Sequence, residues 1–199
     1  MKMELFENPF VVQAEEYQDE FGSDAHRNVA REAVRKSLVL LKNDNIFPLL
    51  SNQSIFVAGR NANDIGAQCG GWTMTWQGDR GEITEGKTIL DGIKEQADDV
   101  TYHLYGIGAA DHDVAIVVIG EDPYAEFLGD DDDLSLYEED IEVLNNVYSA
   151  GIPVVTILVS GRPMILTDHL DNWDALIAAW LPGTEGDGVA EVMLSLIHI

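Results

Sequence analysis

The hydrophobic positions of the chain fall into short, continuous apolar runs that alternate with stretches of helical spacing. Four runs are apolar at nearly every position, namely residues 54–58, 114–119, 153–159 and 175–180. Runs of this length and character are typical of strands that are covered on both faces. Because helices alternate with these strands, we expect an α/β fold: a three-layer sandwich with a mostly parallel sheet and helices on both faces.

The spacing of the remaining apolar residues predicts the helices. A first helix is expected over residues 25–43, with Ser23 or Asp24 as its N-cap. The other expected elements are helices over 87–96, over 136–150 and from about residue 187 onward, and a strand over 100–105. Gly151 is placed to end the helix over 136–150, because glycine commonly terminates helices.

Two stretches show no clear period. Residues 1–24 mix acidic and aromatic side chains, and we interpret them as an interdomain linker that precedes one domain over residues 25–199. Residues 59–86 form a long loop within that domain. Loops of this length are usually functional or disordered, and the tryptophans in this one argue against disorder.

Composition limits the classes of partner. The 199 residues are 46% hydrophobic and carry a net charge of −25, from 36 acidic residues against 11 lysines and arginines. This charge repels nucleic-acid phosphates and anionic lipid surfaces, so we expect neither nucleic acid nor membrane as a partner. The single cysteine, Cys69, forms no disulfide within the chain and leaves the compartment open.

Several familiar site patterns fail on their spacing. The glycines at 106 and 108 lack the third glycine of a dinucleotide fingerprint, since residue 111 is an aspartate. The acidic run 130–133 has Ser135 and Ile141 where a calcium loop needs glycine and glutamate. The five histidines lack metal-ligand spacing, and the serine-hydrolase pattern GxSxG is absent from the sequence. The sequence therefore predicts no metal and no cofactor.

The most promising chemistry follows the apolar run 114–119. The segment Gly120–Asp130 carries Tyr124 and Glu126 among acidic and aromatic neighbours. Open α/β sheets place their functional groups just beyond the carboxyl ends of the strands. A lone glutamate is most often a surface residue, so the position of Glu126, rather than its type, makes it the candidate proton donor.

Trp72 and Trp76 lie four residues apart in the long loop. One interpretation is a hydrophobic plug beneath the loop. Their neighbours are mostly small or polar, which favours the other interpretation, an exposed aromatic face. The C–H face of a sugar ring packs well on an indole while its hydroxyl groups bind nearby polar groups. These two residues are therefore candidates for sugar binding.

Five segments in a fixed order resemble glycoside hydrolase family 3, specifically its C-terminal α/β sandwich domain. The segments are HRNVAREAVRKSLVLLKND (26–44), QCGGWTMTWQGDRG (68–81), DVAIVVIGEDPYAEFLGD (113–130), VVTILVSGRPM (154–164) and ALIAAWLPGTEGDGVAEV (175–192). The resemblance extends from about residue 5 to residue 193. The GGWTxxWQG and PYAE motifs look most like the branch of β-glucosidases and exo-β-glucanases.

The resemblance implies roles for individual residues. In this family a (β/α)8 barrel domain comes first and supplies an aspartate nucleophile. Glu126, in the PYAE motif, would then be the general acid/base. Trp76, in the WQG motif, would form one wall of the aromatic clamp around the outer sugar. Beside these residues, we take Trp72 and Tyr124 as further candidate substrate contacts. Arg162 and Glu185 lie in matching motifs, but the resemblance gives them no direct role.

The function implied is that of a retaining β-glucosidase or exo-1,3/1,4-β-glucan glucohydrolase, which releases terminal non-reducing β-D-glucosyl residues. Its partners would be a β-glucan or gluco-oligosaccharide and the barrel domain of the same full-length protein. The resemblance also implies a periplasmic or secreted full-length protein. Because the nucleophile belongs to the barrel, we expect the chain alone to be inactive.

The chain departs from the family pattern at both ends. Residues 1–10 resemble only the end of the barrel domain, and residues 194–199 resemble nothing in the family, so we expect a truncated domain. An alternative function is a non-catalytic glycan-binding or interaction module that uses Trp72 and Trp76. A phosphate-accepting signalling domain is a further alternative, but it needs a lysine at a later strand end, where Arg162 is the nearest residue.

Overall fold

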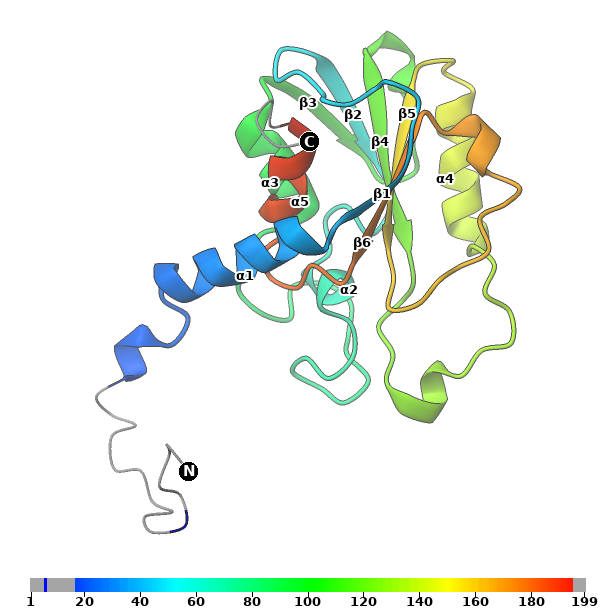
Figure 1. Ribbon diagram of the computed structural model, residues 1–199. Helices are drawn as coiled ribbons and strands as arrows, with labels where there is room; N and C mark the ends of the chain where they lie inside the picture. Colours follow the sequence, from blue (N-terminus) through cyan, green and yellow to red (C-terminus); the bar gives the residue numbers. More distant parts are fainter. Residues whose placement is uncertain (1–5, 7–16, 195–199) are drawn as a thin grey trace.

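The computed structural model describes residue 6 and residues 17–194, which include a six-stranded sheet (Figure 1). The strands are β1 (Val39–Asn43), β2 (Ser54–Ala58), β3 (Asp99–His103), β4 (Val114–Gly120), β5 (Val154–Val159) and β6 (Ala175–Trp180). Their order across the sheet is β1-β6-β5-β4-β2-β3. All neighbours pair in parallel except β1 and β6, which are antiparallel. The predicted mostly parallel sheet is confirmed.

Helices cover both faces of the sheet. The α-helices are α1 (Asp24–Ser37), α2 (Ile65–Cys69), α3 (Ile89–Gln96), α4 (Glu138–Tyr148) and α5 (Asp187–Leu194). Short 3₁₀ turns are η2 (Gln18–Glu20), η3 (Ala109–Asp111), η4 (Glu126–Gly129) and η5 (Leu170–Asn172). In Figure 1, α3 and α5 lie on one face and α4 on the other, while α1 extends away from the body. The predicted three-layer arrangement is confirmed.

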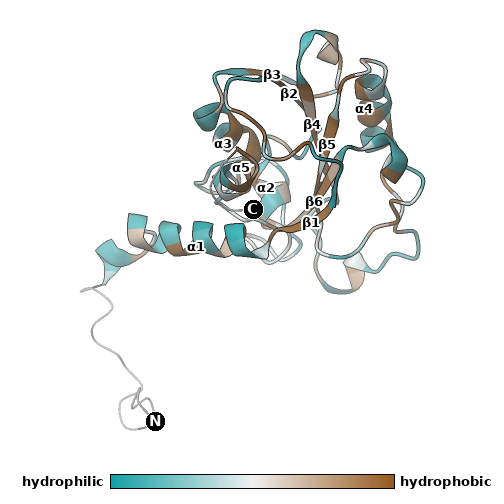
Figure 2. Cartoon of the chain, turned by 45° about the horizontal axis from the view of Figure 1, so that its top comes forward, coloured by the Kyte–Doolittle hydropathy of each residue, from teal (hydrophilic) through white to brown (hydrophobic). Residues whose placement is uncertain are grey.

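The core lies in two layers, one on each side of the sheet. Alternate residues of β4 pack into the two layers. Val114, Ile116 and Val118 face the side of α3 and α5. Ala115, Val117 and Ile119 pack on the side of α4. Every residue of β4 is buried, which is the reason for its unbroken apolar sequence. Figure 2 shows hydrophobic residues along the strands inside the domain and mostly hydrophilic residues along α1.

The first predicted helix, over residues 25–43, is wrong in its last six residues, 38–43. Helix α1 ends at Ser37, Leu38 has extended backbone angles, and residues 39–43 form β1. A short apolar run such as Leu38–Leu41 is compatible with either structure when only its periodicity is considered. Pairing with the edge of β6 decides the outcome, because β1 gains ladder hydrogen bonds there.

The other predicted elements are present with small shifts at their ends. The helix expected over 87–96 begins at Ile89, because Thr88 and Asp91 form a reciprocal capping box in front of it. The loop over 59–86 contains one short helix, α2, which Asp64 caps through its side chain. Gly151 adopts a positive φ of 67° just after α4, as a helix terminator does.

Parts of the predicted domain division lie outside the described residues. Most of the expected linker, residues 1–5 and 7–16, falls there, as do residues 195–199 of the tail that we expected not to resemble the family. Leu194, the first residue of that tail, is the last residue of α5. Over the residues that the structure describes, the helices are too short or too polar to cross a bilayer.

Candidate active site

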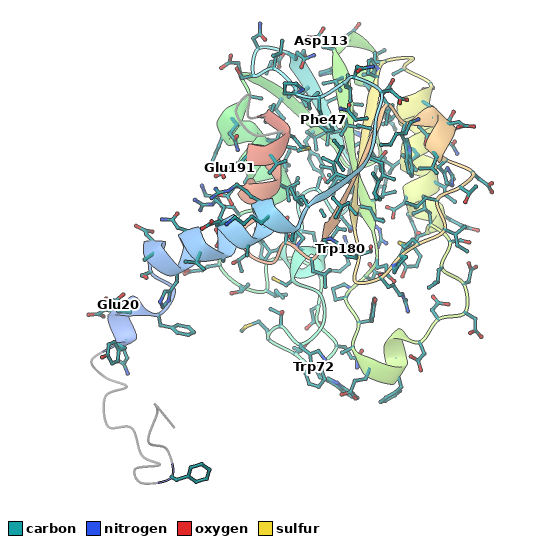
Figure 3. The ribbon with its side chains drawn as sticks, viewed as in Figure 1. Glu20, Phe47, Trp72, Asp113, Trp180 and Glu191 are labelled. Carbon is teal, nitrogen blue, oxygen red and sulfur yellow. The ribbon has the colours of Figure 1, made fainter. Side chains whose placement is uncertain are left out.

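The loops that carry the candidate residues meet at one end of the sheet, beyond the carboxyl ends of its parallel strands. Figure 3 shows Trp72 at this end and Asp113, which precedes β4, at the opposite end. We define two loops here: the tryptophan loop, residues 70–80, and the acid loop, residues 121–130. The expectation that the candidate chemistry lies beyond the carboxyl end of β4 agrees with this geometry.

The acid loop presents Glu126 to the outside. Glu126 is exposed and begins the 3₁₀ turn η4. Its φ of 50° lies in the left-handed region, which costs a residue with a side chain about 1–2 kcal/mol. The next two side chains, Phe127 and Leu128, are also exposed. Contacts elsewhere in the loop must therefore hold this conformation.

The tryptophan loop exposes two indoles to solvent at the same end of the sheet. Trp72 is 67% exposed and Trp76 is 42% exposed, so the interpretation of these residues as a core plug is wrong. The backbone N–H of Trp72 donates to the backbone carbonyl oxygen of Trp76 across 3.0 Å, which folds the loop back on itself. The two ring centroids are 6.3 Å apart with an interplanar angle of 56°.

The residues on either side of Glu126 bind the tryptophan loop. The Ala125 N–H donates to Oε1 of Gln77 across 3.0 Å. The ring of Phe127 meets the Trp76 ring edge-on, with centroids 5.6 Å apart. Because both neighbours of Glu126 contact Trp76 or the residue after it, the structure brings Glu126 and Trp76 together.

Glycines allow the two loops to approach. A Cβ atom on Gly71 would lie 2.0 Å from the carbonyl oxygen of Tyr124. A Cβ on Gly78 would lie 2.7 Å from Cβ of Pro123. Real Cβ atoms do not come this close to other atoms, so any side chain at either position would push the loops apart.

Tyr124 lies inside the acid loop. Its hydroxyl donates to Oε2 of Glu121 across 3.3 Å, and its half-buried ring packs beneath the guanidinium of Arg162. Burial and then the negative charge of Glu121 raise the pKa of Tyr124. The phenol therefore stays protonated and acts as a donor at neutral pH.

A pocket of about 230 Å³ lies beside Tyr124. Trp72 and Tyr124 both line it, together with Gly71, Pro123, Gly161 and Leu181. Two of the three expected substrate contacts, Trp72 and Tyr124, therefore line the same pocket. The third, Trp76, lies against Phe127 at the surface.

Ion pairs and hydrogen bonds connect the acid loop to Arg60, Arg80 and Asp140. Arg60 and Arg80 both donate to Oδ1 of Asp122, Arg80 across 2.7 Å. Arg60 also places Nε 3.4 Å from Oδ1 of Asp140, a fully buried residue of α4. The Gly120 N–H donates to the other carboxyl oxygen of Asp140 across 3.1 Å.

Burial dominates the titration of Asp140. It raises the pKa of this carboxyl to about 6, against the opposing effects of Arg60 and the Gly120 N–H. The group therefore changes charge within the physiological range, directly beneath the end of β4. Sequence reasoning missed this residue. Its helical spacing with the buried Val143, Leu144 and Val147 was a usable signal, because that spacing places it on the apolar face of α4.

Glu185 has a structural function. It is 2% exposed, and its two carboxyl oxygens accept from Arg27 across 2.9 Å and from Arg31 across 3.2 Å. Both arginines belong to α1, so Glu185 attaches this helix to the segment before α5. Among the residues that the structure describes, no three His, Cys, Asp or Glu side chains form a group that could hold a metal ion.

Comparisons with known proteins agree on one family. The model of the glycosyl hydrolase family 3 C-terminal domain matches residues 38–197. The lysosomal beta glucosidase of Dictyostelium discoideum is 35% identical over 221 residues, which cover 98% of this chain and 27% of that protein.

Solved structures give the same result. The exo-1,3/1,4-beta-glucanase of a Pseudoalteromonas species superposes with a TM-score of 0.84 at 43% identity, over 90% of this chain and 24% of that one. A beta-glucosidase from Listeria innocua in complex with isofagomine superposes with a TM-score of 0.81 at 27% identity, over 95% of this chain and 28% of that one.

The chain spans about a quarter of the length of each of these three relatives. The family model nevertheless covers the tryptophan loop, the acid loop and all six strands of the sheet, from β1 to β6. This chain belongs to glycosyl hydrolase family 3, and it carries the C-terminal domain of that family.

Proposed function

We propose that the chain is the acid/base-bearing half of a retaining β-glucosidase or exo-1,3/1,4-β-glucan glucohydrolase, with Glu126 as the general acid/base. One observation supports this proposal above the others. The exposed Glu126 carboxyl lies between two residues, Ala125 and Phe127, that bind the loop of the exposed Trp76 indole. A proton donor and a sugar-stacking face therefore share one surface.

In this mechanism Glu126 protonates the glycosidic oxygen as it leaves, while an aspartate of a barrel domain attacks the anomeric carbon. Glu126 then removes a proton from water, which releases the sugar from the aspartate. Retaining enzymes hold the two carboxyl groups ~5–5.5 Å apart. An exposed carboxyl on a projecting loop is suited to this arrangement, because the opposing carboxylate comes from another domain.

The aromatic residues suit the glucosyl substrate. Trp76 offers an exposed indole as one wall of the outer sugar site, and Trp72 offers another above the pocket. Tyr124 borders the same pocket from the acid loop. The relatives named β-glucosidase and exo-1,3/1,4-beta-glucanase support terminal β-D-glucosyl residues of a β-glucan or gluco-oligosaccharide as the substrate.

The proposed organisation of the whole protein follows from the same reasoning. Residues 1–24 act as an interdomain linker, and a (β/α)8 barrel domain of the same protein carries the nucleophile. Because a two-carboxylate reaction needs both groups, the isolated chain is expected to be inactive.

The test replaces Glu126 with Ala in the full-length protein. With an aryl glucoside whose leaving group needs protonation, kcat/KM is expected to fall by about 10²–10⁴-fold, the usual contribution of general acid catalysis. Asp132→Ala is the matched control, because Asp132 is an exposed carboxylate in the acidic run 130–133, just after the acid loop. It should change kcat/KM by less than about twofold. If Glu126→Ala leaves kcat/KM unchanged, the assigned role is wrong.

A second candidate function is a non-catalytic glycan-binding module, which the exposed pair of indoles favours. In that case the full-length protein binds gluco-oligosaccharides but does not hydrolyse them. Titration while following tryptophan fluorescence, combined with sugar analysis of the same samples, separates the two functions. Binding without released glucose supports the module, and release of glucose that depends on Glu126 supports the hydrolase.

A further inference from the structure

Arg162 follows β5 and lies outside the acid loop, yet it contacts that loop at both of its ends. Its Nε donates to Oε1 of Glu121, the first residue of the loop, across 2.7 Å. Its Nη1 donates to the carbonyl oxygen of Gly129, next to the last residue. One guanidinium therefore joins the two ends of the segment that carries Glu126.

The same guanidinium also holds the middle of the loop. Its central carbon lies 4.5 Å from the centre of the Tyr124 ring, a distance typical of cation–π contact. Gly129 packs closely against the same ring, since a Cβ atom there would lie 2.2 Å from Cδ2 of Tyr124. The acid loop is thus folded around Arg162 rather than merely adjacent to it.

The partner carboxylate, Glu121, is committed to this structure. It is 5% exposed, and besides Arg162 its oxygens accept from the Gly161 N–H across 3.2 Å and from the Tyr124 hydroxyl across 3.3 Å. With two neutral donors and one cation as its partners, this buried carboxylate anchors the loop. The geometry thus separates the two glutamates of the loop: Glu121 is held, and Glu126 remains exposed.

We propose that Arg162 is a positioning residue that fixes the acid loop and so aims Glu126 at the glycosidic oxygen; this inference rests on the proposed function. Glu126 lies between the two anchor points in a left-handed conformation that is costly on its own. When the hydrogen bond from Arg162 to the Gly129 carbonyl is lost, the end of η4 is held less firmly and Glu126 relaxes. A misplacement of about 1 Å can cost a catalytic group on the order of 10²-fold in rate.

The chemistry of arginine fits this role and that of lysine does not. The guanidinium is planar, donates in several directions at fixed angles and stacks on aromatic rings. Glu121, Gly129 and Tyr124 use these three properties together. An ammonium group at this position would keep the charge for Glu121 but would lose the second anchor and the stacking.

The experiment uses the full-length protein and two substrates that differ only in the leaving group. Phenyl β-glucoside needs its leaving oxygen protonated, whereas 2,4-dinitrophenyl β-glucoside needs little assistance. We expect Arg162→Met to lower kcat/KM on the order of 10²-fold for the phenyl substrate and less than about threefold for the dinitrophenyl substrate. Arg162→Lys should give an intermediate ratio.

Controls separate positioning from folding. Arg35→Met removes an exposed arginine that pairs with Glu191 of α5. It should lower kcat/KM only slightly, and equally for the two substrates. Urea unfolding of each variant shows whether it folds. If Arg162→Met does not fold, Arg162→Lys is compared by the same ratio of kcat/KM values.

The outcomes distinguish this inference from the proposed function. In one outcome, Glu126→Ala loses more kcat/KM on the phenyl substrate than on the dinitrophenyl substrate, whereas the Arg162 variants lose equal amounts on both. This result would overturn the inference and leave the proposed function intact. Absence of a leaving-group effect in Glu126→Ala itself would overturn the proposed function. If Glu126→Ala and the Arg162 variants both lose more kcat/KM on the phenyl substrate, with the smaller loss in the Arg162 variants, the result supports both the proposed function and this inference.

Discussion

Asp140 makes the stability of this domain depend on pH in a direction opposite to that of an ordinary paired aspartate. The carboxyl is fully buried, and its pKa of about 6 compares with an ordinary value of 3.8. The native state therefore holds a proton that the unfolded state releases, so stability from this group is complete below about pH 4 and is lost as the pH rises through 6. At about 1.4 kcal/mol per pH unit, this gap corresponds to about 3 kcal/mol.

The perturbation is Asp140→Asn, which keeps the shape and still accepts from the Gly120 N–H but does not titrate. The assay is urea unfolding of both proteins between pH 5 and 7.5, which avoids precipitation near the pI of about 4.1. Roughly half of the effect, about 1.4 kcal/mol, falls within this range. As the pH rises, the free energy of unfolding of the variant should increase by this amount relative to that of the wild type. Asp132→Asn, an exposed control, should not.

A constant difference between wild type and Asp140→Asn across this range would refute the reasoning. It would mean that Arg60, 3.4 Å away, keeps Asp140 ionised throughout. A difference that shrinks with rising pH would also contradict the reasoning, because a raised pKa of Asp140 allows only the opposite slope.

Two further predictions concern the contacts that hold the loops and α1. Glu185→Ala should lower the free energy of unfolding by about 3 kcal/mol, because two arginines lose a buried partner, and Arg35→Met should cost far less. A change below about 1 kcal/mol in urea unfolding would contradict the structural role of Glu185. Gly71→Ala should cost about 1–3 kcal/mol, because its Cβ would lie 2.0 Å from the Tyr124 carbonyl oxygen. An unchanged unfolding midpoint would show that the two loops are not in tight contact.

The fold could be predicted because its central strands are buried on both faces. Their sequences, such as residues 114–119, are apolar throughout and have few alternative interpretations. The stretch after Ser37 could not be predicted in the same way, because residues 39–43 become a strand only through pairing with β6, which is far away in the sequence. Local periodicity does not contain that information.

The candidate site shows a similar division. The position of Glu126 after β4 and the small residues around Trp76 could be recognised from the sequence, and both side chains are exposed. The bond between Gln77 and the Ala125 N–H joins residues 48 positions apart, and that between Arg162 and Glu121 joins residues 41 positions apart. Contacts of this kind depend on how the loops fold over the sheet, so a single sequence gives no local signal for them.

The central claim is that Glu126 is the acid/base of a retaining glycosidase. Full-length Glu126→Ala protein, supplied with 2,4-dinitrophenyl β-glucoside and sodium azide, tests it most directly. Because no carboxylate then activates water or repels the anion, azide should enter and restore turnover, and NMR should identify the product as β-glucosyl azide with retained configuration. Turnover that azide does not change, with glucose as the only sugar product, would contradict the claim.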